Sequence, residues 1–172
     1  MDALEMVARL MEISAVTAPK SRGQNFVATR VLAGEEVAAL ARAMEEFGRR
    51  SGKKDFDRDS RGVASCTTVV LMGLKDAAPL GLDCGACGFQ TCKELTDAGK
   101  TDGEFSGPIC AFRHLDFGIA LGSAVKTAQM LNVDNRIMYR MGVAARLAGM
   151  VDWDFVMGIP LSVTGKNIFF DR

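Results

Sequence analysis

The stretch Thr67-Thr-Val-Val-Leu-Met-Gly-Leu74 is mostly apolar and rich in β-branched residues. A run of this length and composition is typical of a strand that is buried on both faces of a sheet. The sequence therefore predicts one main sheet with this strand inside it, and the rest of the chain must supply the layers that cover it.

Upstream of this strand, the chain alternates between helical and extended patterns. Residues 3–13 form an amphipathic helix, with Leu4, Val7, Leu10 and Met11 at helical spacing. A polar loop spans Thr17–Asn25, and Phe26–Val31 is expected to be a strand. A second helix is predicted from Gly34 to about Arg50, because the first turn of this helix is acidic, its last turn is basic and Gly52 is a typical stop signal. A charged loop is expected after it, at Lys53–Arg61.

Downstream, a short helix is expected near Gln90–Ala98 and a long one near Phe112–Leu131. The remaining predictions are a helix at Gly142–Ala148 and strands at Arg136–Arg140, Phe155–Pro160 and Asn167–Phe170. Helices and strands alternate, so the predicted class is α/β (α+β) with a single sheet flanked by helices. A chain of 172 residues without internal repeats suggests one domain, residues 1–172.

Composition excludes several classes of protein. The 21 basic and 21 acidic side chains balance, which argues against nucleic-acid binding. A single histidine excludes metal sites built from several histidines. The N-terminal stretch has no basic region before an apolar run, and the longest strongly apolar stretch, Val69–Leu74, is far too short to span a membrane. We therefore expect a cytoplasmic protein that is not membrane-bound.

The five cysteines suggest a metal site. Four of them, Cys84, Cys87, Cys92 and Cys110, are separated by two, four and seventeen residues, and the segment around them is rich in glycine. Four thiolates from one compact segment can enclose a tetrahedral metal or a cubane cluster. Three interpretations remain open from the residues alone: a structural zinc, free or redox-active thiols, and a 4Fe–4S cluster. Zinc is less favoured because such sites usually pair two Cys-x-x-Cys knuckles, and this segment has one.

The run Cys84-Gly-Ala-Cys-Gly-Phe-Gln-Thr-Cys92, followed by a lone downstream Cys110, resembles the cluster-binding domain of the corrinoid iron–sulfur protein large subunit. That resemblance covers about thirty residues, roughly 81–112. It implies that the four cysteines each donate one thiolate to a single 4Fe–4S cluster. Cys66 is then left over, and its place in a predicted strand indicates a small buried residue.

Nearly the whole chain also resembles a prokaryotic family described as containing a ferredoxin domain. The residues that carry this are 12–25, Asp116–Ala128 and the tail Gly158–Arg172. The layout of helices and loops is in turn similar to the nitroreductase fold, in which FMN binds at a homodimer interface. That likeness implies FMN contacts from Lys20, Arg22, Asn25 and Lys166. The chain lacks the paired N-terminal arginines that precede a serine in nitroreductases.

These observations predict an iron–sulfur electron-transfer protein that acts with a redox partner protein and forms a homodimer. An FMN-dependent oxidoreductase fed by the cluster and a zinc-stabilised interaction module remain as alternatives. The sequence leaves open whether the protein is an enzyme.

Overall fold

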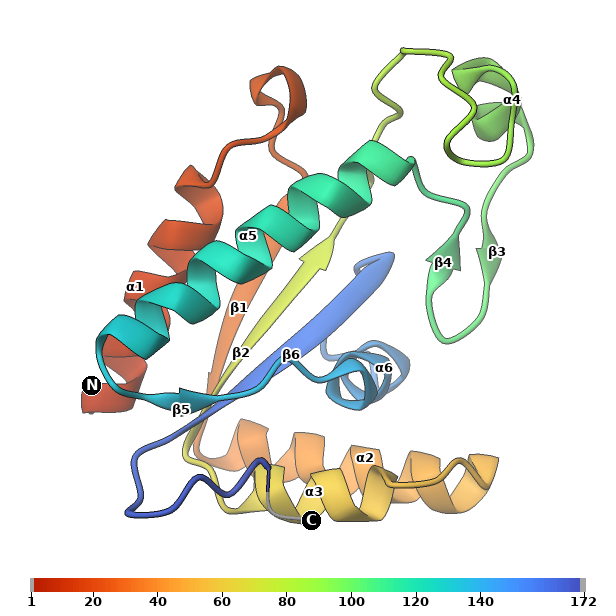
Figure 1. The fold of residues 1–172 in the computed structure, drawn as a ribbon. Coiled ribbons are helices and arrows are strands. Elements are labelled where there is room, and N and C mark those ends of the chain that lie inside the picture. Colours follow the sequence, from red (N-terminus) through yellow and green to blue (C-terminus); the bar gives the residue numbers. More distant parts are fainter. Residues whose placement is uncertain (1, 171–172) are drawn as a thin grey trace.

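The computed structural model describes residues 2–170, and its centre is a four-stranded antiparallel sheet in the order β1-β2-β6-β5 (Figure 1). The strands are β1 (Val27–Ala33), β2 (Thr68–Leu74), β6 (Phe155–Ser162) and the short β5 (Asp134–Asn135). Strands β3 (Thr101–Asp102) and β4 (Ser106–Gly107) form a separate hairpin.

Strand β2 pairs with β1 on one side and β6 on the other, and all seven of its residues are buried. Its side chains alternate between the two faces of the sheet, as strand geometry requires. Val70, Met72 and Leu74 belong to one apolar cluster, whereas Val69 and Leu71 belong to the other. The prediction of a strand buried on both faces is confirmed.

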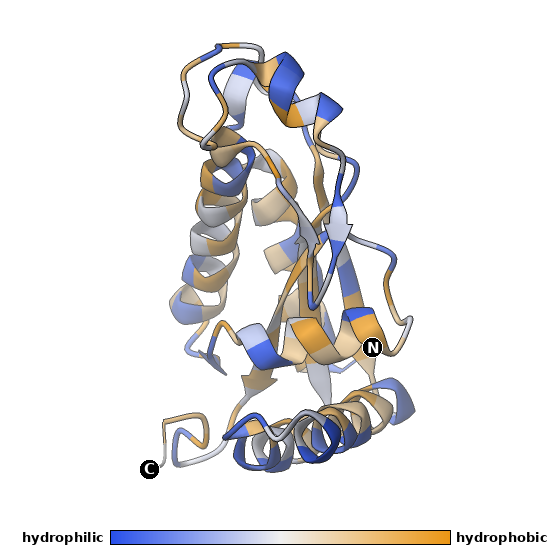
Figure 2. Cartoon of the chain, turned by 90° about the vertical axis from the view of Figure 1, so that its right-hand side faces the viewer, coloured by the Kyte–Doolittle hydropathy of each residue, from blue (hydrophilic) through white to orange (hydrophobic). Residues whose placement is uncertain are grey.

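Five of the helices supply the covering layers (Figure 1). Helices α1 (Ala3–Thr17) and α5 (Ala111–Met130) pack side by side over one face. Helices α2 (Glu35–Ser51), α3 (Phe56–Ala64) and α6 (Tyr139–Leu147) pack over the other. The predicted class, a single sheet flanked by helices, is confirmed. Figure 2 shows hydrophilic residues around the small helix α4 (Cys92–Asp97). This helix lies in a lobe that residues 80–110 form beyond the end of the sheet.

Three local predictions are wrong. The predicted loop at Lys53–Arg61 contains most of α3, because Phe56 and Val63 bury against α2 while the buried Asp59 is paired with Arg58 and Arg140. The predicted strand at Arg136–Arg140 makes only an isolated bridge, at Met138, before α6 begins.

The third wrong prediction is the strand at Asn167–Phe170, where the chain turns instead. The Asn167 side chain accepts a hydrogen bond from the backbone N–H of Phe169 (3.0 Å), which favours a turn. The last two residues of the tail quoted above, 171–172, and residue 1 lie outside the described residues. Within residues 2–170, none of the helices combines the length and the apolarity that crossing a bilayer requires.

Candidate metal centre

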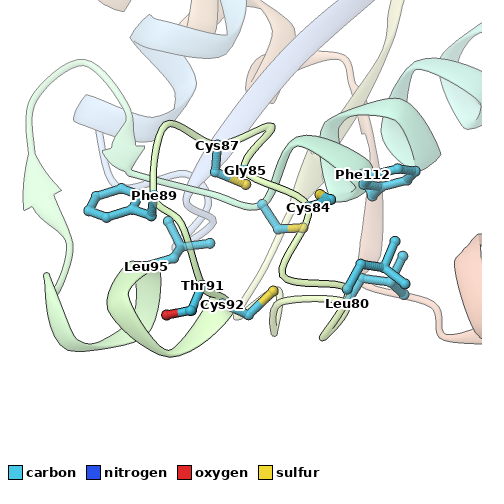
Figure 3. A pocket seen from close by; sticks show the side chains of 11 residues that line it. Leu80, Cys84, Gly85, Cys87, Phe89, Thr91, Cys92, Leu95 and Phe112 are labelled. Atoms are coloured by element: carbon cyan, nitrogen blue, oxygen red, sulfur yellow. The ribbon is translucent and has the colours of Figure 1, made fainter.

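The four clustered cysteines line one small hollow in the lobe between β2 and α5 (Figure 3). Figure 3 shows the side chains of Cys84, Cys87 and Cys92 turned towards the middle of the loop. Cys110 is almost fully buried, at 2% exposure, whereas Cys84 is exposed. The structure thus places all four of these cysteines around one hollow, and their role as metal ligands stays a prediction.

The loop that carries the first three cysteines is shaped by its backbone. Gly85 and Gly88 have φ values of 73° and 86°, which only glycine adopts easily, and the Gly88 N–H donates to the Gly85 carbonyl (3.0 Å). The Asp83 carboxylate accepts a hydrogen bond from the Cys92 N–H (2.7 Å), which closes the loop. These contacts fold the loop so that Cys84, Cys87 and Cys92 line the same hollow.

Cys110 comes from a different segment, because it is the residue directly before the first residue of α5. The first N–H groups of a helix have no partners within the helix and carry partial positive charge, so they stabilise a nearby anion. The Ala111 N–H donates to the sulfur of Cys87 (3.1 Å). The start of α5 thus provides an environment suited to thiolates.

The pKa values of the two inner thiols respond to this environment. Burial alone would raise the pKa of Cys110, but the backbone N–H groups of Leu80, Phe112 and Arg113, together with the Cys87 thiol, hold it below its usual value. Burial raises the pKa of Cys87 despite the hydrogen bond from Ala111. The start of α5 therefore favours the ionised form of Cys110.

The donor set fits a soft, thiolate-bound centre. Besides the cysteines, the hollow is lined by apolar residues, glycine and one threonine, with neither carboxylates nor imidazole: Leu80, Leu82, Gly85, Phe89, Thr91, Leu95 and Phe112. Such surroundings suit zinc or an iron–sulfur cluster and do not suit magnesium or calcium. Among residues 2–170, however, no group of three or more histidine, cysteine, aspartate or glutamate side chains is already assembled at metal-binding geometry.

The residues proposed for FMN occupy separate places. Lys20 donates to the carbonyls of Ala15, Val16 and Ala18, each at 2.8 Å, and so caps the end of α1. Burial lowers its pKa, although Asp116 opposes this. Arg22 and Asn25 lie on the same exposed loop. Lys166 follows β6 at the opposite end of the sheet, so one chain does not bring it near Lys20. An FMN site formed by these residues stays a prediction.

Sequence reasoning missed a buried ion pair beside the cysteines. Arg113 and Asp116 lie one helical turn apart on α5, with 0% and 4% exposure and an N–O distance of 3.2 Å. The available signal was an Arg-x-x-Asp pair at helical spacing immediately after Cys110.

The fold defines the class. Solved structures with the same fold include an FMN-dependent nitroreductase from Mycobacterium smegmatis in complex with NADPH, with a TM-score of 0.63 and 11% identity over 94% of this chain and 78% of that one. A nitroreductase with bound FMN from Desulfitobacterium hafniense has a TM-score of 0.59 and 13% identity over 96% and 80% of the two chains. The protein therefore has a nitroreductase-like fold.

The family follows from sequence. A protein of Archaeoglobus fulgidus, described as uncharacterized, is 46% identical over 171 residues, which is 99% of this chain and 92% of that one. Residues 106–172 match the family described as "Uncharacterized protein containing a ferredoxin domain" (DUF2148). The chain belongs to this family. The matched region includes Cys110 but not the other three cysteines of the hollow.

Proposed function

We propose that the protein is a one-electron carrier that holds a 4Fe–4S cluster on Cys84, Cys87, Cys92 and Cys110. The observation that carries the proposal is the convergence of these four side chains on one hollow that has no other metal-binding side chain. Membership of a ferredoxin-domain family and the likeness to a fold found in redox enzymes both support it. When bound, such a cluster accepts and releases one electron at a time.

The residues around the hollow have distinct tasks in this proposal. Leu80, Leu95 and Phe112 form its apolar wall and limit access of water to the sulfurs. The Ala111 N–H at the start of α5 donates to the Cys87 sulfur and would stabilise its negative charge. Cys84 is exposed, and its neighbour Leu82 is 46% exposed, so this side of the lobe is where a redox partner protein would make contact.

The proposal is tested by purifying the protein without oxygen and measuring iron, sulfide, zinc, absorbance and EPR spectra. We expect about four iron and four sulfide ions per chain, and a brown colour that bleaches on reduction. Serine at Cys84 or Cys110 should lower the iron content and change the EPR spectrum. A colourless anaerobic protein with one zinc per chain would instead establish the structural-zinc alternative.

FMN binding is the second candidate, and the nitroreductase-like fold is the observation that favours it. In this alternative the cluster would feed electrons to a flavin held by Lys20, Arg22, Asn25 and Lys166. The position of Lys20 counts against it, since its ammonium group is already bound to three carbonyls. Because Lys20 is engaged in this way, titration of the protein into FMN should leave the flavin fluorescence unchanged. Quenching that saturates at one FMN per chain would support FMN binding.

A further inference from the structure

Arg113 is the largest side chain that is fully buried within residues 2–170. Its guanidinium group donates in three directions beyond α5: to the Ala78 carbonyl (2.8 Å), to the Gln24 side chain (2.5 Å) and to the Ser21 carbonyl (3.3 Å). Its Cζ atom lies over the Phe26 ring, 4.7 Å from the ring centre. A planar group with five fixed donors can join several chain segments at once, which a lysine cannot.

Asp116 completes this junction. Its carboxylate pairs with Arg113 and accepts hydrogen bonds from both the backbone N–H and the hydroxyl of Ser21, each at 2.8 Å. Burying a charged group is costly unless it is paired and fully hydrogen-bonded. Because the two charged groups bind each other and also bind two other segments of the chain, their geometry is tightly fixed.

The segments joined in this way are those that surround Cys110. Arg113 lies one turn after Cys110 on α5, and its backbone N–H donates to the Cys110 carbonyl (2.9 Å). Ala78 lies two residues before Leu80, which lines the cysteine hollow and packs with Cys110 and Leu95 in one apolar cluster. The Arg113 side chain therefore joins the start of α5 to the segment that follows β2.

We propose that Arg113 is a positioning residue of the cysteine site: it fixes the segment Ala78–Leu80 against the start of α5, where the Ala111 N–H donates to the Cys87 sulfur (3.1 Å). The inference rests on the proposed function for its redox consequence and on geometry alone for its structural one. N–H donors to the sulfurs of a cluster stabilise its reduced form, so loosening this segment shifts the reduction potential to more negative values.

Arg140 is a matched control on the other face of the sheet. Its guanidinium group contacts Asp59 (2.8 Å), Asp55 (3.2 Å) and the Lys54 carbonyl (3.1 Å), and it lies over the Phe56 ring. Arg113→Lys and Arg140→Lys thus remove comparable networks, but only the first adjoins the cysteines. Gln24→Ala is a milder variant, because Gln24 is exposed and contributes one partner of Arg113.

The experiment has two parts. The amides of Ala111 and His114 report on the start of α5, because they donate to the Cys87 sulfur (3.1 Å) and the Cys110 carbonyl (3.3 Å). In the metal-free protein, their hydrogen exchange should be about tenfold faster in Arg113→Lys, less so in Gln24→Ala, and unchanged in Arg140→Lys. In the anaerobically loaded protein, the midpoint potential should fall and air should bleach the cluster faster in the same order. Thermal unfolding of each variant shows how far general destabilisation contributes.

Equal exchange rates and potentials in Arg113→Lys and the unchanged protein would overturn the inference. So would equal effects in Arg140→Lys, since these would reflect general loss of stability. If Arg113→Lys does not fold, Gln24→Ala decides in its place. If the unchanged protein takes up no iron or sulfide, the proposed function fails, and the exchange rates alone still decide whether Arg113 positions the segment.

Discussion

At the scale of single residues, Cys66 differs from the other four cysteines in both place and chemistry. It lies just before β2, and its thiol donates a hydrogen bond to the Gly62 carbonyl (3.2 Å). Burial raises the pKa of this thiol to about 12, so it stays protonated and unreactive at neutral pH. Cys66 is thus a small packing residue and does not belong to the cysteine hollow.

We therefore expect Cys66→Ala to keep the iron and sulfide content of the unchanged protein and to lose about 1 kcal/mol of stability. In the metal-free protein, iodoacetamide should modify the exposed Cys84 well before Cys66, as peptide mass spectrometry would reveal. Loss of iron from Cys66→Ala would show that this cysteine takes part in the metal site.

The ionised carboxylate of Asp116 is expected to make the stability of the fold depend on pH. Burial would raise the pKa of its carboxyl group, but the Ser21 N–H and hydroxyl and the Arg113 guanidinium hold it below the usual value. A lowered pKa in the folded state means that the stabilisation is complete at neutral pH. It is lost as the pH falls below the ordinary carboxyl value, about 3.9, towards the lowered one.

Asp116→Asn should accordingly cost about 3 kcal/mol of unfolding free energy at pH 7, because it leaves the Arg113 charge buried without its partner. Urea unfolding between pH 7 and pH 3 should show this difference shrinking as the medium becomes more acidic. A difference that stays constant across this range would mean that Asp116 does not ionise as described.

At the scale of elements, α6 and β6 approach so closely that a side chain does not fit between them. A Cβ atom on Gly142 would overlap the backbone carbonyl of Val156, and one on Gly158 would overlap the Met141 side chain. Backbone cannot move aside as a flexible side chain can, so Gly142 is required where the helix crosses the strand.

Gly142→Ala should lower the unfolding free energy by about 2–3 kcal/mol. Gly62→Ala in α3 is the control, since nothing lies within 4 Å of the added methyl group. It should raise stability by about 0.5–1 kcal/mol through better helix propensity. Chemical denaturation measures both, and a neutral Gly142→Ala would contradict the close packing of α6 on β6.

The elements also show which parts of the fold could be predicted from sequence. Helices α2 and α5 and strand β2 have local apolar patterns long enough to identify them. Helix α3 was missed because its buried Asp59 looks like a solvent-exposed residue until Arg140, 81 positions away, pairs with it. The short segment before α6 was misread because its apolar and basic residues fit either a strand or a helix.

In the candidate site, too, some features could be predicted from the sequence and others could not. The four cysteines could be found from their spacing, since they lie within one short segment of the chain. The junction at Arg113 could not, because its partners Gln24 and Ala78 are 89 and 35 positions away. Contacts of that range depend on the folded arrangement of α5, β2 and the loop after α1, which no local pattern encodes.

At the scale of the whole molecule, the lobe with the cysteines differs from the body in how it is stabilised. The two large apolar clusters lie on the faces of the sheet, whereas the lobe has only three buried residues of its own, Leu80, Leu95 and Cys110. So small a core cannot fold a segment without another source of stability. In the proposed function, the cluster supplies it.

Removing the metal with a chelator should therefore loosen the lobe and leave the body folded. Hydrogen exchange should rise at residues 81–110 and stay slow in β2 and β6. Circular dichroism should change little, because most helices and strands belong to the body. Uniform protection before and after chelation would show that the lobe does not depend on a metal.

The homodimer expected from the sequence remains a prediction, and the outer face of α1 and α5 is where we expect it to form. These helices lie side by side (Figure 1), and several large apolar side chains on them are exposed: Met6, Leu10, Ile13, Val16, Leu115, Ile119 and Met130. Ile13 and Leu115 are each 59% exposed, and Gly118 and Gly122 leave open space along α5. An exposed apolar patch of this kind marks an association surface in soluble proteins.

A second copy suits this face, because two such flat helical pairs can meet about a twofold axis and bury roughly 800 Å² on each. Light scattering after gel filtration should give twice the chain mass for the unchanged protein and the chain mass for Ile13→Glu combined with Leu115→Glu. Leu147→Glu on α6, where the side chain is 43% exposed, should stay dimeric. If the double variant is still dimeric, the dimer contact lies elsewhere on the molecule. If the protein without substitutions is monomeric, the homodimer is refuted and the apolar face binds some other partner.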